Sequence, residues 1–175
     1  MSGVEKPNNI RTVLHEILRP ITSKIAVATS GGIDSASLVM AAKDLNKKQI
    51  IVSFTFDDFE SHDFKSARLL AKHFNLDFLP VILPSDQNEI VKTVHYLIKE
   101  IKCKKKSAIE CMFPFVYLLK ILKENKIKTL VTGLAADGHF GLSKKAMIHY
   151  SKDDKKFQQL RQEYFSTYES AHIIR

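Results

Sequence analysis

Short apolar stretches alternate along this chain with longer segments in which apolar side chains recur every three or four residues. The short stretches are nearly continuous runs of aliphatic, β-branched or aromatic residues, as in strands buried on both faces of a parallel sheet. They cover residues 24–29, 49–56, 78–83 and 129–132. The periodic segments predict helices over residues 12–18, 36–45, 62–74, 87–101, 107–125 and most of 144–174.

The ends of these elements carry recognisable signals. Pro20 ends the first helix, and Asp86 is a suitable N-cap for the helix that follows it. Pro114 lies inside a helical pattern and predicts a kink or a later start of that helix. Strands that alternate with helices at this spacing predict an α/β fold, a single doubly wound parallel sheet with helices on both faces and right-handed crossovers.

The chain of 175 residues has room for one ordinary domain, and no internal repeat or linker divides it. With 45% hydrophobic and 26% charged residues, the composition is that of a globular protein. No apolar run is long enough for a membrane span and the amino terminus lacks a signal core, so we expect a cytoplasmic protein. Cys103 and Cys111 match neither a disulfide framework nor a CxxC metal pair.

A formal net charge of +8 raises the question of a polyanionic partner. The excess is concentrated in lysines at positions 99, 102, 104, 105, 106, 120, 123, 126 and 128. A solvated helix face with a basic loop explains this pattern most simply, and RNA or a nucleotide is the alternative.

The segment Ser30-Gly31-Gly32-Ile33-Asp34-Ser35 lies between the first strand and the next helix, where it has the properties of an anion cradle. Its glycines permit positive φ and a close approach of the backbone to a phosphate. Its serines offer hydroxyl donors, and the helix that follows offers free N–H groups. Asp34 would repel a phosphate unless its carboxylate holds Mg2+ that bridges to the phosphate oxygens. A tight strand–helix turn without a ligand is the simpler alternative.

This string fits neither GxxxxGK[ST] nor GxGxxG, and it resembles the PP-loop of the ATP pyrophosphatases. Two further stretches are similar to the synthase domain of the asparagine synthetases. SFTFDDFESHDFKSARLLAKHFNLDFLPV resembles its second strand and SxD…A…A helix, and CMFPFVYLLKILKENKIKTLVTGLAADGHFG resembles the stretch leading into its SGEGADELFGGY loop. The resemblance runs from about Lys24 to Gly141 and implies an adenine nucleotide alpha hydrolase-like fold.

The resemblance also implies a set of site residues. Pyrophosphate and Mg2+ would be held by the PP-loop residues Ser30, Gly31, Gly32, Asp34 and Ser35. Adenosine would lie against Ala28 and the strand end at Phe54 and Phe56, and Thr132 and Gly133 would lie near the ribose and the α-phosphate. Asp137 would supply the second carboxylate for the metal. Two carboxylates at the ends of adjacent strands could share a cation that neutralises the departing pyrophosphate.

The sequence departs from the asparagine synthetases at several positions. Leu134 stands where family members that make asparagine have a glutamate that assists proton transfer, which leucine cannot do. Gly138 replaces a second common acidic residue, and His139 after it is a weak candidate for a substitute base. We expect the glutaminase domain and the later segment with the family's ATP-site lysine to be missing, which would make this single domain, residues 1–175, a shortened homologue or a fragment.

The resemblance implies a domain that uses ATP and Mg2+ to adenylate a small carboxylate for amide formation, releasing AMP and pyrophosphate. The nitrogen donor stays open, and a separate glutaminase or another protein subunit is a candidate partner. Two alternatives stay open: a catalytically degenerate subunit that binds nucleotide or serves in assembly, and a PP-loop enzyme that modifies tRNA or bases. The first is favoured by Leu134 and the second by the lysines.

Overall fold

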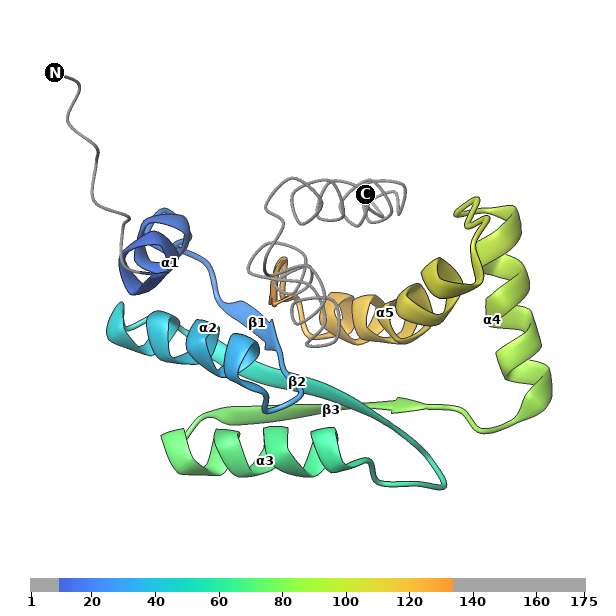
Figure 1. The fold of residues 1–175 in the computed structure, drawn as a ribbon, viewed down its shortest axis with the longest axis horizontal. Helices are drawn as coiled ribbons and strands as arrows, with labels where there is room; N and C mark the ends of the chain where they lie inside the picture. Colours follow the sequence, from blue (N-terminus) through green and yellow to red (C-terminus); the bar gives the residue numbers. More distant parts are fainter. Residues whose placement is uncertain (1–9, 134–175) are drawn as a thin grey trace, which may run out of the picture. The chain divides into compact units, whose positions relative to one another are not determined.

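The computed structural model describes residues 10–133 of the chain. The chain divides into two compact units. One unit contains Met1–Pro84 and Tyr117–Gly133 and holds the whole sheet, and the other contains Ser85–Val116 and Leu134–Arg175. Most of the described elements of both units are labelled in Figure 1.

The sheet of the first unit has four strands, all parallel, in the order β3-β2-β1-β4. The strands are β1 (Ile25–Ala28), β2 (Gln49–Phe56), β3 (Asp77–Leu83) and β4 (Thr129–Thr132). The predicted α/β parallel sheet is therefore confirmed. Pro80 is accommodated because β3 lies at the edge of this sheet, where a missing N–H costs little.

Three of the described helices lie entirely within this unit: α1 (Ile10–Leu18), α2 (Ile33–Asp44) and α3 (His62–Phe74). Strand β1 is followed by α2 and β2 by α3, each connecting neighbouring parallel strands. The chain then returns past β1 to form β4 on its other side, so the direction of strand addition reverses between β1 and β4. A reversal of this kind leaves a crevice at the carboxyl ends of the two strands, where ligands bind in open α/β sheets.

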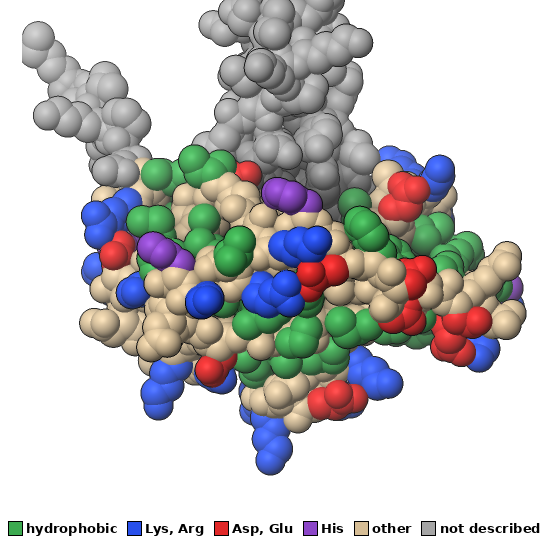
Figure 2. All heavy atoms as spheres, turned by 90° about the horizontal axis from the view of Figure 1, so that it is seen from below, with side chains coloured by type: hydrophobic (Ala, Val, Ile, Leu, Met, Phe, Trp, Pro, Cys, Tyr) green, Lys and Arg blue, Asp and Glu red, His purple; other side chains and the backbone are tan. Residues whose placement is uncertain are grey.

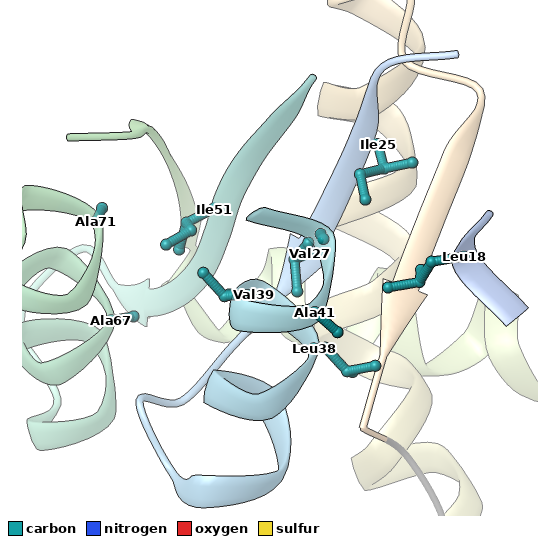
Figure 3. Packing of buried hydrophobic residues seen from close by; sticks show 10 residues of the cluster. Leu18, Ile25, Val27, Leu38, Val39, Ala41, Ile51, Ala67 and Ala71 are labelled. Carbon is teal, nitrogen blue, oxygen red and sulfur yellow. The ribbon is translucent and has the colours of Figure 1, made fainter. Parts of the chain in front are cut away.

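The core lies between the sheet and the helices α2 and α3 (Figure 3). Ile25 and Val27 of β1 and Ile51 of β2 are fully buried, and they pack with side chains of the two helices. The helix residues of this cluster are Leu38, Val39, Ala41, Ala42, Ala67 and Ala71. Ala26, Ile50 and Val52 point to the opposite face of the sheet and are buried as well, which explains why the strands read as continuous apolar runs.

Helix α1 packs against α2. Its last residue, Leu18, is 1% exposed, and burial of a leucine side chain stabilises a fold by about 2 kcal/mol. Asp44 of α2 accepts hydrogen bonds from Arg11 at 2.9 Å and from His15 at 3.1 Å. The bond from His15 and the charge of Arg11 lower the pKa of the Asp44 carboxyl below its ordinary value.

The second unit contains α4 (Gln87–Lys99) and the first part of α5 (Lys106–Glu124), whose last turns belong to the first unit. Asp86 caps α4 as predicted, accepting hydrogen bonds from the backbone N–H groups of Asn88 and Glu89 at 3.0 Å each. Among residues 10–133, no helix has the length and apolar character needed to cross a membrane.

The predicted start of α2 was wrong, and one of the two alternatives left open at Pro114 is excluded. Helix α2 begins at Ile33, three residues earlier than predicted, because Gly32 takes the N-cap position immediately after the turn. Helix α5 begins upstream of Pro114 and continues through it, so the alternative of a later start is excluded. The loop and helix predicted after Gly133 lie outside the described residues.

Candidate functional site

The turn between β1 and α2 is built around two glycines. Gly31 has φ of +79°, a left-handed conformation that glycine adopts without strain. A Cβ atom at Gly31 would lie 2.5 Å from the Ser66 Cβ and 2.9 Å from the Ser66 carbonyl carbon, so this glycine is also needed for the close approach of α3. Gly32 has extended backbone and precedes the first residue of α2.

Hydrogen bonds of the Thr29 and Ser35 hydroxyl groups stabilise this turn on its buried side. Thr29, which is 6% exposed, donates from Oγ1 to the Ser35 Oγ at 2.6 Å and accepts the Gly31 N–H at 2.9 Å. The Ser35 hydroxyl in turn donates to the Gly32 carbonyl at 3.1 Å. The Ser35 hydroxyl therefore both donates and accepts a hydrogen bond within the turn. The exposed Ser30 hydroxyl accepts the Gly32 N–H at a long distance of 3.4 Å, its only hydrogen bond within residues 10–133.

Sequence reasoning overlooked Thr29. A lone threonine at the end of a strand gives no signal, because its role depends on Ser35, six residues later, folding back above it.

The amino terminus of α2 presents unpaired backbone donors. No side chain caps it, and within residues 10–133 the N–H groups of Ile33, Asp34 and Ser35 have no hydrogen-bond acceptor. The next helix of the same unit, α3, is closed by Ser61, whose hydroxyl accepts the Phe64 N–H at 3.1 Å. Uncapped N–H groups at a helix amino terminus, with the positive end of the helix dipole, form a ready site for an anion.

The ends of β1 and β4 meet at this turn. Ala28, the last residue of β1, is in register with Thr132, the last residue of β4. The Cβ position of Gly133, the next residue, lies 3.4 Å from the Asp34 Cβ and 3.6 Å from the Ser35 backbone N. The structure thus brings together the two glycine-bearing segments that the sequence singled out, at the reversal of strand order.

Asp34 is an exposed carboxylate in the first turn of α2. It makes no hydrogen bond or ion pair with another described residue. Among the described residues, no three His, Cys, Asp or Glu side chains gather into a metal site. Mg2+ does not need such a cage, because it commonly binds one or two carboxylates together with substrate phosphates and water.

The aromatic residues expected near adenosine lie at the end of β2. Phe54 is half-buried and Phe56 is 40% exposed. The loop beyond them is held by Thr55, which is 6% exposed, donates to the Phe59 carbonyl and accepts the Ser61 N–H at 3.0 Å. Asp137, Leu134 and His139 lie outside the described residues, and the distance between Asp34 and Asp137 is therefore still a prediction.

The lysines at positions 99, 102, 104, 105 and 106 are exposed, and Lys106 pairs with Glu110 at 3.6 Å. On the face shown in Figure 2, the described Lys and Arg side chains are interspersed with acidic and hydrophobic ones. They do not form a continuous basic patch on this face.

A parallel α/β sheet with a glycine turn and an open helix terminus at its switch point is the arrangement of the doubly wound α/β proteins, whose ligands bind at that point. The family model of asparagine synthase matches residues 22–172, most of the chain. The chain therefore belongs to the asparagine synthase family, which confirms the resemblance identified from its PP-loop and the two longer stretches.

A similar solved structure is the NH3-dependent NAD synthetase from Campylobacter jejuni subsp. jejuni NCTC 11168, in complex with the nitrate ion. It has 15% sequence identity and a TM-score of 0.45, and the similarity covers 70% of this chain and 52% of that one. The chain thus spans about half the length of that protein. No curated protein sequence gives a significant match.

Proposed function

We propose that this protein binds ATP with Mg2+ at the carboxyl ends of β1 and β4 and transfers AMP to a small carboxylate, releasing pyrophosphate. Attack by ammonia on the acyl-adenylate would then form an amide and release AMP. The observation that supports this best is the uncapped amino terminus of α2 beside Gly133, in a chain of the asparagine synthase family.

Each part of the site has a proposed role. The free N–H groups of Ile33 and Asp34, together with the Ser30 hydroxyl, would donate to the β- and γ-phosphates. Gly133 has no side chain, which would let the α-phosphate approach the first turn of α2. Ala28, Phe54 and Phe56 would lie along the adenosine, and Thr132 near the ribose. Pre-positioned donors of this kind stabilise the charge that develops on a leaving pyrophosphate.

The residues present fit magnesium. Asp34 offers an exposed carboxylate without a protein partner among residues 10–133, and oxygen ligands are those that Mg2+ prefers. Asp137 is the proposed second ligand. Bound there, the ion would neutralise phosphate charge and help pyrophosphate to leave.

The reaction is tested with the full chain, ATP, MgCl2, ammonium and a series of small carboxylates that begins with aspartate. We expect AMP and pyrophosphate in equal amounts, formed only when an acceptor is present. With an 18O-labelled carboxylate, one labelled oxygen should appear in AMP, because the acyl-adenylate breaks between carbon and that oxygen. Release of ADP and phosphate, or AMP without label, would contradict the proposal.

A second candidate function is nucleotide binding without turnover. It is favoured by Leu134, which cannot exchange a proton where family members that make asparagine have a glutamate. Calorimetry would then show Mg2+-dependent ATP binding while the assay above shows no pyrophosphate release with any acceptor. Replacing Leu134 by glutamate would test whether that position alone prevents turnover.

A further inference from the structure

We infer that Thr29 is a positioning residue of the pyrophosphate site: acting through Ser35, it fixes the direction of the uncapped N–H groups at the start of α2. This inference rests on the proposed function, since it assumes that a diphosphate binds there. Thr29 itself is buried beneath the turn, at 6% exposure, and would not contact the ligand directly.

The first step concerns the direction of the hydrogen bonds made by the Thr29 and Ser35 hydroxyl groups. Thr29 donates its proton to Ser35 and Ser35 donates its own to the Gly32 carbonyl, so each hydroxyl has one defined acceptor. The Thr29 oxygen accepts the Gly31 N–H as well. One buried side chain thus holds the glycine with positive φ and the serine in the first turn of the helix.

The second step is what this does to the Gly32 carbonyl. It accepts from the Ser35 hydroxyl at 3.1 Å and from the Ala36 N–H at 2.9 Å, so it is directed into the helix. In a trans peptide the carbonyl and the following N–H point in opposite directions. The Ile33 N–H is therefore directed out of the helix end, to where an anion would bind.

The third step is the attachment of Thr29 to the sheet. Its own N–H donates to the Val52 carbonyl of β2 at 3.0 Å, so the residue that holds the turn continues the hydrogen bonding of the central strands. Loss of the hydroxyl should free the turn while leaving the strand in place. Removing a group that orients hydrogen-bond donors toward a ligand usually weakens ligand binding, because the donors are then no longer held in the binding geometry.

The test uses Thr29→Val, which keeps the shape of the side chain and removes the hydroxyl, and Thr29→Ser, which restores it. The matched control is Thr55→Val, because Thr55 is equally buried and its hydroxyl likewise makes two hydrogen bonds, both of them to backbone groups in the loop before α3. The probe is inorganic pyrophosphate with Mg2+, which avoids any effect on adenosine. Its affinity is measured by calorimetry on the full chain, alongside urea unfolding.

We expect Thr29→Val to weaken pyrophosphate binding at least tenfold, and Thr29→Ser to bind within about threefold of the original chain. Thr55→Val should lose comparable stability and bind pyrophosphate within about twofold. Because Thr29 and Ser35 share a hydrogen bond, the loss of affinity in the double variant Thr29→Val/Ser35→Ala should be smaller than the sum of the two single losses. Full additivity, or an equal loss in Thr55→Val, would overturn the inference.

If Thr29→Val does not fold, a measurement on the original chain still tests the inference. Amide hydrogen exchange in the original chain should show that the Gly31 N–H is protected, because the buried Thr29 hydroxyl accepts it. Exchange at the unprotected rate would overturn the inference.

If the original chain does not bind pyrophosphate, both the proposed function and the role of Thr29 are excluded. If it binds and Thr29→Val binds equally well, only Thr29 is excluded.

Discussion

The amino termini of α2 and α3 follow neighbouring parallel strands, yet their first turns are completed differently. Both helices have an aspartate as their second residue, Asp34 in α2 and Asp63 in α3. Helix α3 closes its own terminus with Ser61, whose N–H is in turn accepted by Thr55. Helix α2 has Gly32 at its N-cap position and leaves its first N–H groups unpaired among residues 10–133.

Charge distinguishes the two termini as well. The acidic residue before α3, Glu60, pairs with Arg68 at 2.8 Å and with Lys65 at 4.0 Å, so the helix supplies its own counter-ions. Asp34 has no such partner in the described part of the chain. A cap makes a helix terminus stable and closed, whereas a missing cap leaves donors for a ligand at some cost in stability. We interpret α3 as the structural helix and α2 as the binding helix.

The largest expected effect is that of Asp34→Ala. It should lower Mg2+-dependent turnover by about 100- to 1000-fold, or about 3–4 kcal/mol, as expected for loss of a group that stabilises developing charge. The measurement is pyrophosphate release, or ATP affinity with and without Mg2+ if there is no turnover. Asp63→Ala is the matched control and should bind ATP as the original chain does. Unchanged ATP use by Asp34→Ala would remove the metal role.

Gly31→Ala tests the close approach of the turn between β1 and α2 to Ser66 of α3. The new Cβ would collide with Ser66 and the backbone would be held at φ of +79°, so we expect the free energy of unfolding to fall by about 2–3 kcal/mol. Urea unfolding measures this loss. Gly133→Ala is the control, because its Cβ would make ordinary contacts of 3.4 Å or more and should cost under about 0.5 kcal/mol. Equal stability of the two variants would refute the close approach of α3.

Gly32→Asn would give α2 the kind of cap that α3 already has. The extended backbone of Gly32 admits a side chain, whose Cβ would meet only the Ser30 Oγ, at 3.3 Å. We expect a gain in stability of about 0.5 kcal/mol and about tenfold weaker pyrophosphate binding, because the new amide oxygen competes for the same N–H groups. Gly32→Ala, which has no acceptor, is the control. Stronger pyrophosphate binding by Gly32→Asn would contradict an anion site at this terminus.

Ser61→Ala is expected to have the smallest effect. Removing the cap of α3 should lower the free energy of unfolding by about 1 kcal/mol and leave pyrophosphate affinity within twofold. Calorimetry and urea unfolding of the same preparation separate the two quantities. A loss of pyrophosphate affinity as large as that in Gly32→Asn would show that the termini of α2 and α3 do not differ in function.

Much of the fold could be predicted from local patterns. Strand β2 and helix α3 have the predicted boundaries, because each is a long segment with one clear periodicity between turn residues. The start of α2 was predicted too late, because residues 30–35 were assigned as a whole to the glycine turn, whereas the last three of them belong to the helix. Pro114 suggested a later helix start that α5 does not have.

The candidate site was predictable in part for the same reason. Gly31, Gly32 and Asp34 stand within four residues of one another, so their shared turn could be read from the sequence. The contact of Gly133 with Asp34 joins segments a hundred residues apart and required the strand order. The pairing of Thr29 with Ser35 required the helix to begin at Ile33.

By itself, the sequence determined the alternation of strands and helices, the parallel sheet and the glycine turn that bears an aspartate, because these follow from short-range periodicity and backbone freedom. Only the tertiary structure decided that β4 lies beside β1, that Ser66 lies close to Gly31, and that Thr29 stabilises the turn by accepting the Gly31 N–H. Those contacts depend on which elements become neighbours when apolar faces are buried together. The packing of the whole unit determines these neighbours, so they cannot be predicted from the pattern of any one segment.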